Sequence, residues 1–210
     1  MKTILCFGDS NTWGYDPLKE QRYSLTERWT GILRQELGSD YWVVEEGLNG
    51  RTTVWPDPIE GYKSGKEYLI PCITSHKPID LVIIMLGTND LKARFSLTAD
   101  DIARGAGVLV KMVQQSDAGP NEQAPGVLLI TPAPIQDTSQ TRFAEMFAGA
   151  EAKSRRLSEH FRRVAGETGC FSLDAGAVVT SSTIDGIHLE AGEHLKLGRA
   201  VARQVLQIFA

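Results

Sequence analysis

Three residues near the two ends of the chain have the chemistry needed for nucleophilic acyl transfer. Ser10 follows Gly8 and Asp9, and Asp185 and His188 form an Asp-x-x-His pair. In such a set the histidine takes the proton of the serine hydroxyl, and the acid orients the imidazole. Each motif alone also fits a turn or a helix cap, because Gly, Asp and Ser favour both.

Two further blocks add polar groups that could act with this set. Asn89 stands in Gly-Thr-Asn-Asp at 87–90, and Gly-Leu-Asn-Gly-Arg-Thr occupies 47–52. An amide such as that of Asn89 can hold an oxyanion, a contribution of roughly 3–4 kcal/mol to transition-state stabilisation. Each block alone again fits a turn, but the four together supply nucleophile, base, acid and oxyanion donors.

Short apolar runs alternate with helical patterns, which predicts a parallel sheet covered by helices on both faces. The predicted strands are Thr3–Phe7, Trp42–Glu45, Asp80–Leu86, Gly126–Thr131 and Cys170–Asp174. The predicted helices are 27–37, 98–113 with a Thr98/Asp101 capping box, 143–165 and 190–208. Right-handed crossovers bring all strand carboxyl ends to one edge, where sites form. The stretches 47–78 and 132–140 are expected to be irregular loops at that edge.

The composition excludes several other classes of protein. The chain has 210 residues, which fits one domain over 1–210, and a formal net charge of −4 argues against nucleic-acid binding. The three cysteines show no metal-ligand spacing, so neither a disulfide framework nor a zinc site is expected. The first apolar run is too short for a signal sequence or a membrane span, so we expect a cytoplasmic protein.

In this order the four blocks resemble the SGNH (GDSL) hydrolase superfamily. The resemblance implies a flavodoxin-like α/β fold, a three-layer αβα sandwich around a mostly parallel five-stranded sheet. It implies Ser10, Asp185 and His188 as catalytic residues. It also implies an oxyanion hole formed by the N–H groups of Ser10 and Gly50 and by the Asn89 amide. No metal or organic cofactor is expected.

Longer stretches around these blocks are similar to the aryl esterases and acyltransferases of that superfamily. The stretches are Ile-Leu-Cys-Phe-Gly-Asp-Ser, Glu-Glu-Gly-Leu, Asp-Leu-Val-Ile-Ile-Met-Leu-Gly-Thr-Asn-Asp and Asp-Gly-Ile-His. This likeness implies small acyl esters as substrates and acyl transfer to alcohols. By analogy with the family it also implies a homo-oligomer, for which an octamer is one possible size. The sequence departs from the acyltransferring relative at Asn11 and Gly50, where that relative has Leu and Ala, and Asn11 is expected to make the pocket more polar.

Substrate contacts are predicted for Asn11, Trp13, Phe143 and Ile187, with core packing or an oligomer contact as the alternative. Asp9 and Asp90 are expected to be structural, Lys92 and Arg94 to be solvated, and His160 and His194 to lie on helix surfaces. Arg51 could brace its loop or attract an anionic substrate. Alternative functions are a carbohydrate acetylesterase, a thioesterase or lysophospholipase with the same catalytic set, and a binding module without chemistry.

Overall fold

The computed structural model describes residues 1–210 and contains one five-stranded sheet. Its strands are β1 (Lys2–Gly8), β2 (Tyr41–Gly47), β3 (Leu81–Met85), β4 (Gly126–Thr131) and β5 (Phe171–Asp174). They lie in the order β2-β1-β3-β4-β5, and every neighbouring pair is parallel. The predicted five-stranded α/β sheet is therefore confirmed.

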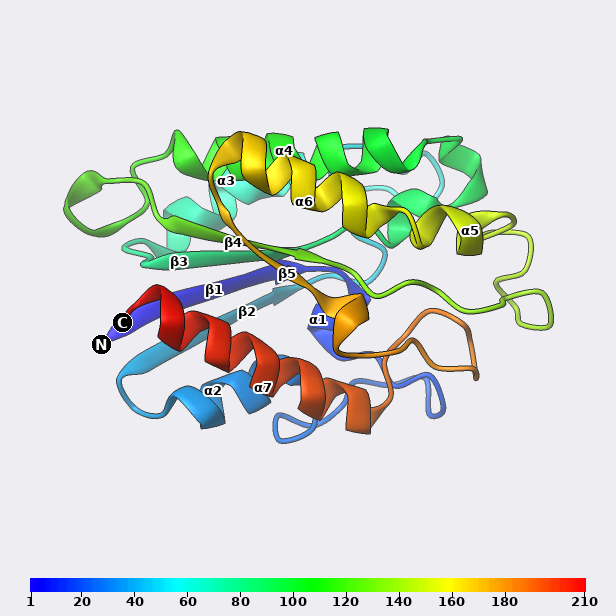
Figure 1. The fold of residues 1–210 in the computed structure, drawn as a ribbon, viewed down its shortest axis with the longest axis horizontal. Helices are drawn as coiled ribbons and strands as arrows, with labels where there is room; N and C mark the ends of the chain where they lie inside the picture. The colour runs from blue at the N-terminus through cyan, green and yellow to red at the C-terminus, as the bar shows by residue number, and fades with distance from the viewer.

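Helices cover both faces of this sheet and form the outer two layers (Figure 1). One face carries α3 (Gly65–His76), α4 (Ala99–Gln114) and α6 (Leu157–Thr168), and the other carries α2 (Trp29–Leu37) and α7 (Ala191–Ile208). The short helices α1 (Ser10–Trp13) and α5 (Ala150–Ser154) lie beyond the strand ends. Helix α4 begins with the predicted capping box, in which Thr98 Oγ1 accepts from Asp101 N–H at 3.1 Å and Asp101 accepts from Thr98 N–H.

Alternate residues of the central strands supply two separate cores. In β1, Leu5 and Phe7 pack with the α3, α4 and α6 side, whereas Ile4 and Cys6 pack with α2 and α7. Both sets are buried, because a parallel sheet covered on two faces needs apolar residues at every position. This explains why the predicted strands show no alternation of apolar and polar residues.

The strand order reverses between β1 and β3, and this switch point fixes where a ligand can bind. In open parallel sheets the crevice outside the carboxyl ends of the strands at the reversal is the usual site. The loops after β1, β2 and β3 all leave the sheet at that edge. The two termini lie together at the opposite end, where Lys2 Nζ is 4.3 Å from the ring centroid of Phe209 (Figure 1).

Two stretches differ from the sequence-based prediction. Residues 65–76 form helix α3, although they lie in the stretch predicted to be irregular. Leu69, Cys72 and Ile73 form its buried apolar face, and this pattern was missed because Pro71 and the flanking glycines interrupt it. Residues 143–149 form turns, and regular helix starts only at Ala150. The predicted long helix 143–165 is thus two shorter helices preceded by a turn-rich segment.

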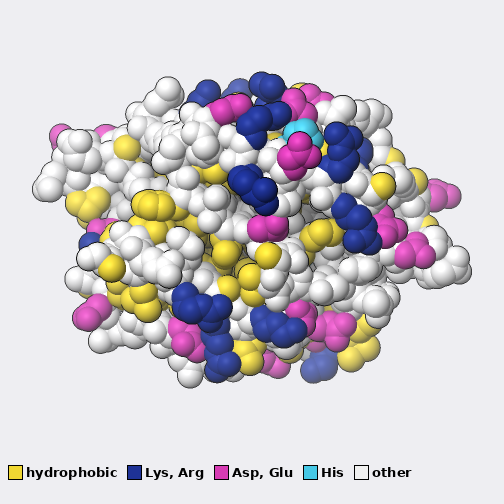
Figure 2. All heavy atoms as spheres, in the orientation of Figure 1, with side chains coloured by type: hydrophobic (Ala, Val, Ile, Leu, Met, Phe, Trp, Pro, Cys, Tyr) yellow, Lys and Arg dark blue, Asp and Glu magenta, His cyan; other side chains and the backbone are white.

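No helix combines the length and apolar character required to cross a membrane. On the face drawn in Figure 2, basic and acidic side chains are interspersed, and neither sign forms a continuous patch.

Candidate active site

Ser10 is the first residue of α1, directly after β1, in a turn that the local sequence enforces. Asp9 caps the helix by accepting the N–H of Asn11 at 3.0 Å, and Gly14 ends it in the left-handed conformation. A Cβ at Gly8 would lie 2.0 Å from Thr12 Oγ1, so only glycine allows the chain to turn this tightly. The turn presents the Ser10 hydroxyl at the carboxyl edge of the sheet.

His188 reaches Ser10 from the other end of the chain. His188 Nε2 lies 2.9 Å from Ser10 Oγ, and His188 Nδ1 lies 2.6 Å from Asp185 Oδ2. The other carboxylate oxygen, Asp185 Oδ1, accepts the backbone N–H groups of Ile187 and His188 at 2.8 and 2.9 Å. Gly186 makes this turn possible with a φ of +81°. Serine, imidazole and carboxylate are therefore joined in one line of hydrogen bonds.

The Asp185 carboxylate is held in its ionised form. Burial raises its pKa, but the hydrogen bonds and charge of His188 and the two backbone N–H donors outweigh burial, so the pKa falls below its ordinary value. An ionised Asp185 accepts a hydrogen bond from Nδ1–H of His188. The tautomer with a free Nε2 lone pair is thereby favoured, and this lone pair faces the serine hydroxyl.

Asn11 braces the histidine loop, with both ends of its amide engaged. Its Nδ2 donates to the carbonyl of Ile187 at 3.4 Å, and its Oδ1 accepts the N–H of Leu189 at 3.0 Å. These bonds hold the backbone on either side of His188. The predicted substrate contact of Asn11 is corrected by this geometry, because the side chain is buried and lies outside the pocket lining.

The two candidate oxyanion donors from the other loops are tied together. Asn89 lies in a 3₁₀ turn after β3, and one N–H of its amide donates to the carbonyl of Arg51 at 3.2 Å. Gly50, the residue before Arg51, has a φ of +82°, and its backbone N–H has no acceptor in the protein. Asn89 retains a second N–H, so both groups can donate to a substrate oxygen beside Ser10.

Asp90 and Arg51 fix these loops from behind. The Asp90 carboxylate accepts the N–H of Thr53 at 3.0 Å and also its hydroxyl. Arg51 Nη1 donates to the carbonyl of Gly8 at 2.9 Å and to that of Glu46, which are at the ends of β1 and β2. Of the two interpretations of Arg51, the brace is the one that these bonds support. Burial raises the pKa of Asp90, and also that of Asp9, to about 6.

A pocket of about 170 Å³ opens in front of Ser10 and His188. Its apolar lining residues include Phe143, Met146, Phe147 and Ile187. The Tyr15 ring lies 4.3 Å from the His188 ring, centroid to centroid, and its hydroxyl accepts from Arg142 at 2.7 Å. The predicted residues Phe143 and Ile187 line the pocket, whereas Trp13 does not, because its ring packs beside Tyr15 and beneath Arg22.

The pocket lining also includes the polar residues Asn49, Glu60, Lys92 and Arg142. Lys92 was expected at the solvated surface, but its side chain is only 2% exposed and pairs with Glu60 and with Asp57 at 3.4 Å. Arg94 Nη1 also pairs with Asp57 at 3.1 Å. Glu60 and Met146 were not predicted from the sequence, because they lie in loops without periodicity and no motif marks them. Asn49 lies in the block 47–52, but no role was predicted for its side chain.

His194 was expected on a helix surface, but it is fully buried between α7 and α2. Its Nδ1 accepts the N–H of Trp29, the first residue of α2, at 3.2 Å. Burial, together with the charge of His188, lowers the pKa of His194 to about 3. A neutral imidazole is required here, because its Nδ1 satisfies a helix-start donor that has no partner within α2.

Comparison with known proteins defines the class to which this fold and site belong. The model of the GDSL-like lipase/acylhydrolase family matches residues 6–194, and a comparison with curated protein sequences found no match. The native aryl esterase of M. smegmatis is 42% identical with a TM-score of 0.95, over 99% of each chain. Est24, a carbohydrate acetylesterase from Sinorhizobium meliloti, is 40% identical with a TM-score of 0.95, over 99% of this chain and 100% of the other.

The fold and the comparisons together define a serine ester hydrolase of the α/β class. The chain belongs to the GDSL-like lipase/acylhydrolase family, which confirms the resemblance found in its sequence.

Proposed function

We propose that this protein hydrolyses small carboxylic esters with Ser10 as nucleophile, His188 as general base and Asp185 as the orienting acid. The observation that supports it best is the continuous line from Ser10 Oγ to His188 Nε2, 2.9 Å, and from His188 Nδ1 to Asp185 Oδ2, 2.6 Å. A serine hydroxyl is a weak nucleophile until an adjacent base accepts its proton, and this geometry supplies the base.

In the acylation step Ser10 Oγ bonds to the ester carbonyl carbon while His188 Nε2 takes the hydroxyl proton. The carbonyl oxygen becomes an oxyanion, which accepts from the N–H groups of Ser10 and Gly50 and from Asn89 Nδ2. When the tetrahedral intermediate collapses, the bond to the leaving oxygen breaks, and the imidazolium donates its proton to the alcohol or phenol. An acyl-Ser10 ester remains.

In the deacylation step water replaces the alcohol as the attacking group. His188 removes a proton from the water, the hydroxide oxygen bonds to the acyl carbon, and the same donors hold the oxyanion. Breakage of the acyl-Ser10 bond then returns the proton to Ser10 Oγ and releases the carboxylic acid. Asp185 stays ionised throughout and stabilises the transient imidazolium.

The size and lining of the pocket favour a substrate with a small acyl or aryl group next to Ser10. The pocket volume is about 170 Å³, its lining includes Phe143, Met146, Phe147 and Ile187, and the Phe143 ring centroid lies 6.3 Å from that of His188. A space of this size favours acetyl over long acyl chains, which argues against a lysophospholipase. We expect kcat/KM to be highest for p-nitrophenyl acetate, lower for the butyrate and lowest for the octanoate.

Hydrolysis of p-nitrophenyl acetate by wild type and Ser10→Ala tests the proposal. We expect Ser10→Ala to lose at least about 10³-fold in kcat while keeping the wild-type circular dichroism spectrum. A fluorophosphonate probe should label wild type and the surface control Ser75→Ala, but not Ser10→Ala. Near-wild-type turnover by folded Ser10→Ala would show that another residue is the nucleophile.

A second candidate is the removal of acetyl groups from carbohydrates. The polar lining residues Asn49, Glu60 and Arg142 offer hydrogen-bond partners for sugar hydroxyls, and Est24 is a carbohydrate acetylesterase. The test compares kcat/KM on acetylated glucose and xylose with that on p-nitrophenyl acetate, in wild type and Glu60→Gln. Selective loss on the sugar esters supports this candidate, and equal loss on both substrates refutes it.

Acyl transfer to alcohols and self-association are the remaining parts of the proposal. Transfer requires an alcohol to enter the pocket ahead of water, and formation of a new ester from vinyl acetate and an alcohol in water measures it.

A homo-oligomer is supported by the exposed apolar side chains of Trp55, Ile59 and Tyr62 in the loop after β2. Light scattering on the purified protein tests it, and cell fractionation tests the predicted cytoplasmic location.

A further inference from the structure

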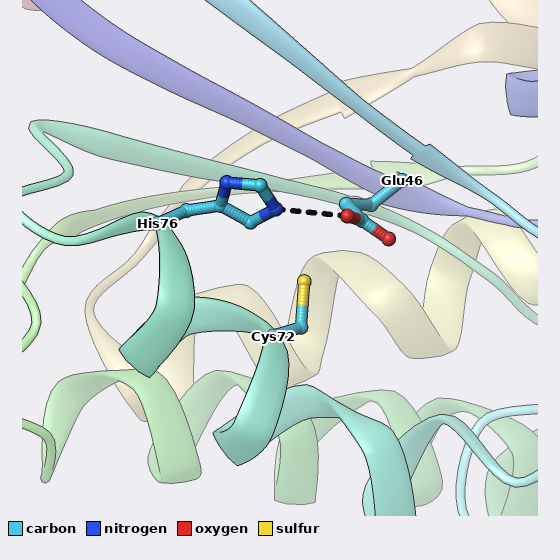
Figure 3. Close-up of side chains that lie close together, drawn as sticks. All are labelled: Glu46, Cys72 and His76. Carbon is cyan, nitrogen blue, oxygen red and sulfur yellow. Dashed lines mark hydrogen bonds and ion pairs between the residues drawn. The ribbon is translucent and has the colours of Figure 1, made fainter.

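Three side chains with metal-ligand chemistry converge on the α3 side of the sheet. Glu46 lies near the end of β2, and Cys72 and His76 project from α3 toward it (Figure 3). One ligand atom from each lies within 4.8 Å of the other two, and His76 Nε2 is 2.9 Å from Glu46 Oε1. The cluster does not contact the Ser10–His188–Asp185 line, and the proposed hydrolysis gives it no role.

The spacing and the types of these ligands are those of a transition-metal site. Residues four apart on a helix share one face, so α3 presents the Cys72 sulfur and the His76 imidazole together. Thiolate, imidazole and carboxylate are the ligands that Zn²⁺ takes in proteins, and three of them leave one position open. Bound ligand atoms would lie roughly 3–4 Å apart, which small side-chain rotations achieve from the present positions.

The burial and the charges of the cluster also fit a dication. Cys72 is fully buried, whereas His76 and Glu46 are partly exposed, and Glu46 also lines a hollow of about 400 Å³. A thiolate and a carboxylate together neutralise a dication, and the displaced thiol proton leaves to solvent. Arg51 is a nearby cation, and its charge favours the thiolate form of Cys72. Its guanidinium donates to the carbonyls of Gly8 and Glu46 and lies over the Phe7 ring.

We propose that Glu46, Cys72 and His76 bind a transition-metal dication of the Zn²⁺ type. No zinc site was predicted from the sequence, because the three cysteines show no metal-ligand motif. Cys72 and His76 also lie in the stretch 47–78 that was predicted to be irregular, where a spacing of four residues does not place two side chains on one face. Helix α3 converts that spacing into a shared face. A metal held here links β2 to α3, on either side of the loop that carries Gly50, and stabilises the folded chain.

Titration of the reduced, metal-free protein with Co²⁺ tests the proposal directly. Wild type should develop a near-ultraviolet band of thiolate-to-cobalt charge transfer, and Zn²⁺ should abolish it by displacement. Cys72→Ser should lose the band. His76→Gln should weaken Zn²⁺ binding at least about 10-fold, measured against a chromophoric chelator. The matched controls Cys170→Ser and His160→Gln alter the same residue types outside the cluster and should bind like wild type.

Hydrolysis of p-nitrophenyl acetate checks that each variant is folded, since none of these substitutions touches the catalytic residues. If Cys72→Ser does not fold, His76→Gln alone decides the matter, because its side chain is partly exposed and its loss leaves the core intact. A wild-type spectrum without a thiolate band overturns the proposal. Equal Zn²⁺ affinity in wild type and His76→Gln overturns it as well.

Discussion

The two carboxylate oxygens of Asp185 do different work. Oδ1 closes the turn by accepting two backbone N–H groups, and Oδ2 accepts from the imidazole of His188. The turn and the orientation of the base therefore depend on the same side chain. This explains why an Asp-x-x-His spacing suffices: the carboxylate both folds the loop and reaches the ring that the loop carries.

Asp185→Asn should separate these two roles. The amide oxygen can still accept the N–H groups of Ile187 and His188, but the NH₂ group would face His188 Nδ1 and favour the tautomer that carries its proton on Nε2. The base is then lost while the turn remains, so we expect kcat for p-nitrophenyl acetate to fall about 10³- to 10⁴-fold. Thermal unfolding checks the fold, and a kcat within tenfold of wild type would contradict the assigned role.

Asn89→Ala should remove one oxyanion donor and leave the nucleophile in place. We expect a loss of about 10²- to 10³-fold in kcat with little change in KM, because the donor acts mainly on the charged transition state. Steady-state kinetics on p-nitrophenyl acetate measures the split. A change confined to KM would mean that Asn89 binds the ground state only.

At the level of elements, α7 and α2 are joined by His194, which accepts the first N–H of α2. This contact requires a neutral ring. Its pKa of about 3 in the fold lies well below the ordinary 6.5, so between these two pH values the unfolded chain binds a proton that the folded chain does not. Stability contributed by neutral His194 is therefore lost as pH falls below 6.5.

His194→Asn should reduce this sensitivity to acid, because its Oδ1 can replace Nδ1 as acceptor but does not titrate. Between pH 7 and pH 5, wild type should lose about 2 kcal/mol more of its free energy of unfolding than the variant. Urea unfolding of both proteins at the two pH values measures the difference. Asp9 and Asp90 titrate in both proteins, so their opposite effect cancels, and parallel pH profiles would contradict the prediction.

In the whole molecule, the loop after β2 is fastened to the loop after β3 by buried charges. Asp57 is fully buried and pairs with Lys92 and Arg94, and Lys92 also pairs with Glu60 at the pocket. Burial raises the pKa of Asp57, but two backbone N–H donors and the charges of Lys92 and Arg94 lower it to a value below its ordinary one. These ion pairs hold Gly50 and Asn89 in a fixed relation although the residues are far apart in sequence.

Lys92→Met should leave Asp57 with a single cationic partner in a buried position. We expect the free energy of unfolding to fall by about 2–3 kcal/mol, because an undercompensated buried charge is costly. Lys77→Met is the matched control, since its pair with Asp117 is exposed and should contribute only about 0–1 kcal/mol. Denaturant unfolding compares the two variants, and equal losses would contradict the role assigned to this cluster.

The amino-acid sequence by itself determined the strands and the polar residues that meet at the edge of the sheet. Apolar runs of four to seven residues between helical patterns predicted the five-stranded sheet, and the polar blocks after the first three strands predicted which residues meet at its edge. These features are local, since a buried strand and the turn after it are written in consecutive residues. Ser10 and Asn89 could be found in this way, and Asp185 and His188 could be found from their Asp-x-x-His spacing.

Only the tertiary structure decided which other side chains join them. Lys92 and His194 are polar and were expected at the surface, but long-range partners bury both. Asn11 faces the histidine loop instead of the pocket, and Cys72 and His76 meet Glu46 because residues 65–76 form a helix despite Pro71. Such contacts depend on residues distant in the chain, and neither periodicity nor motif records them.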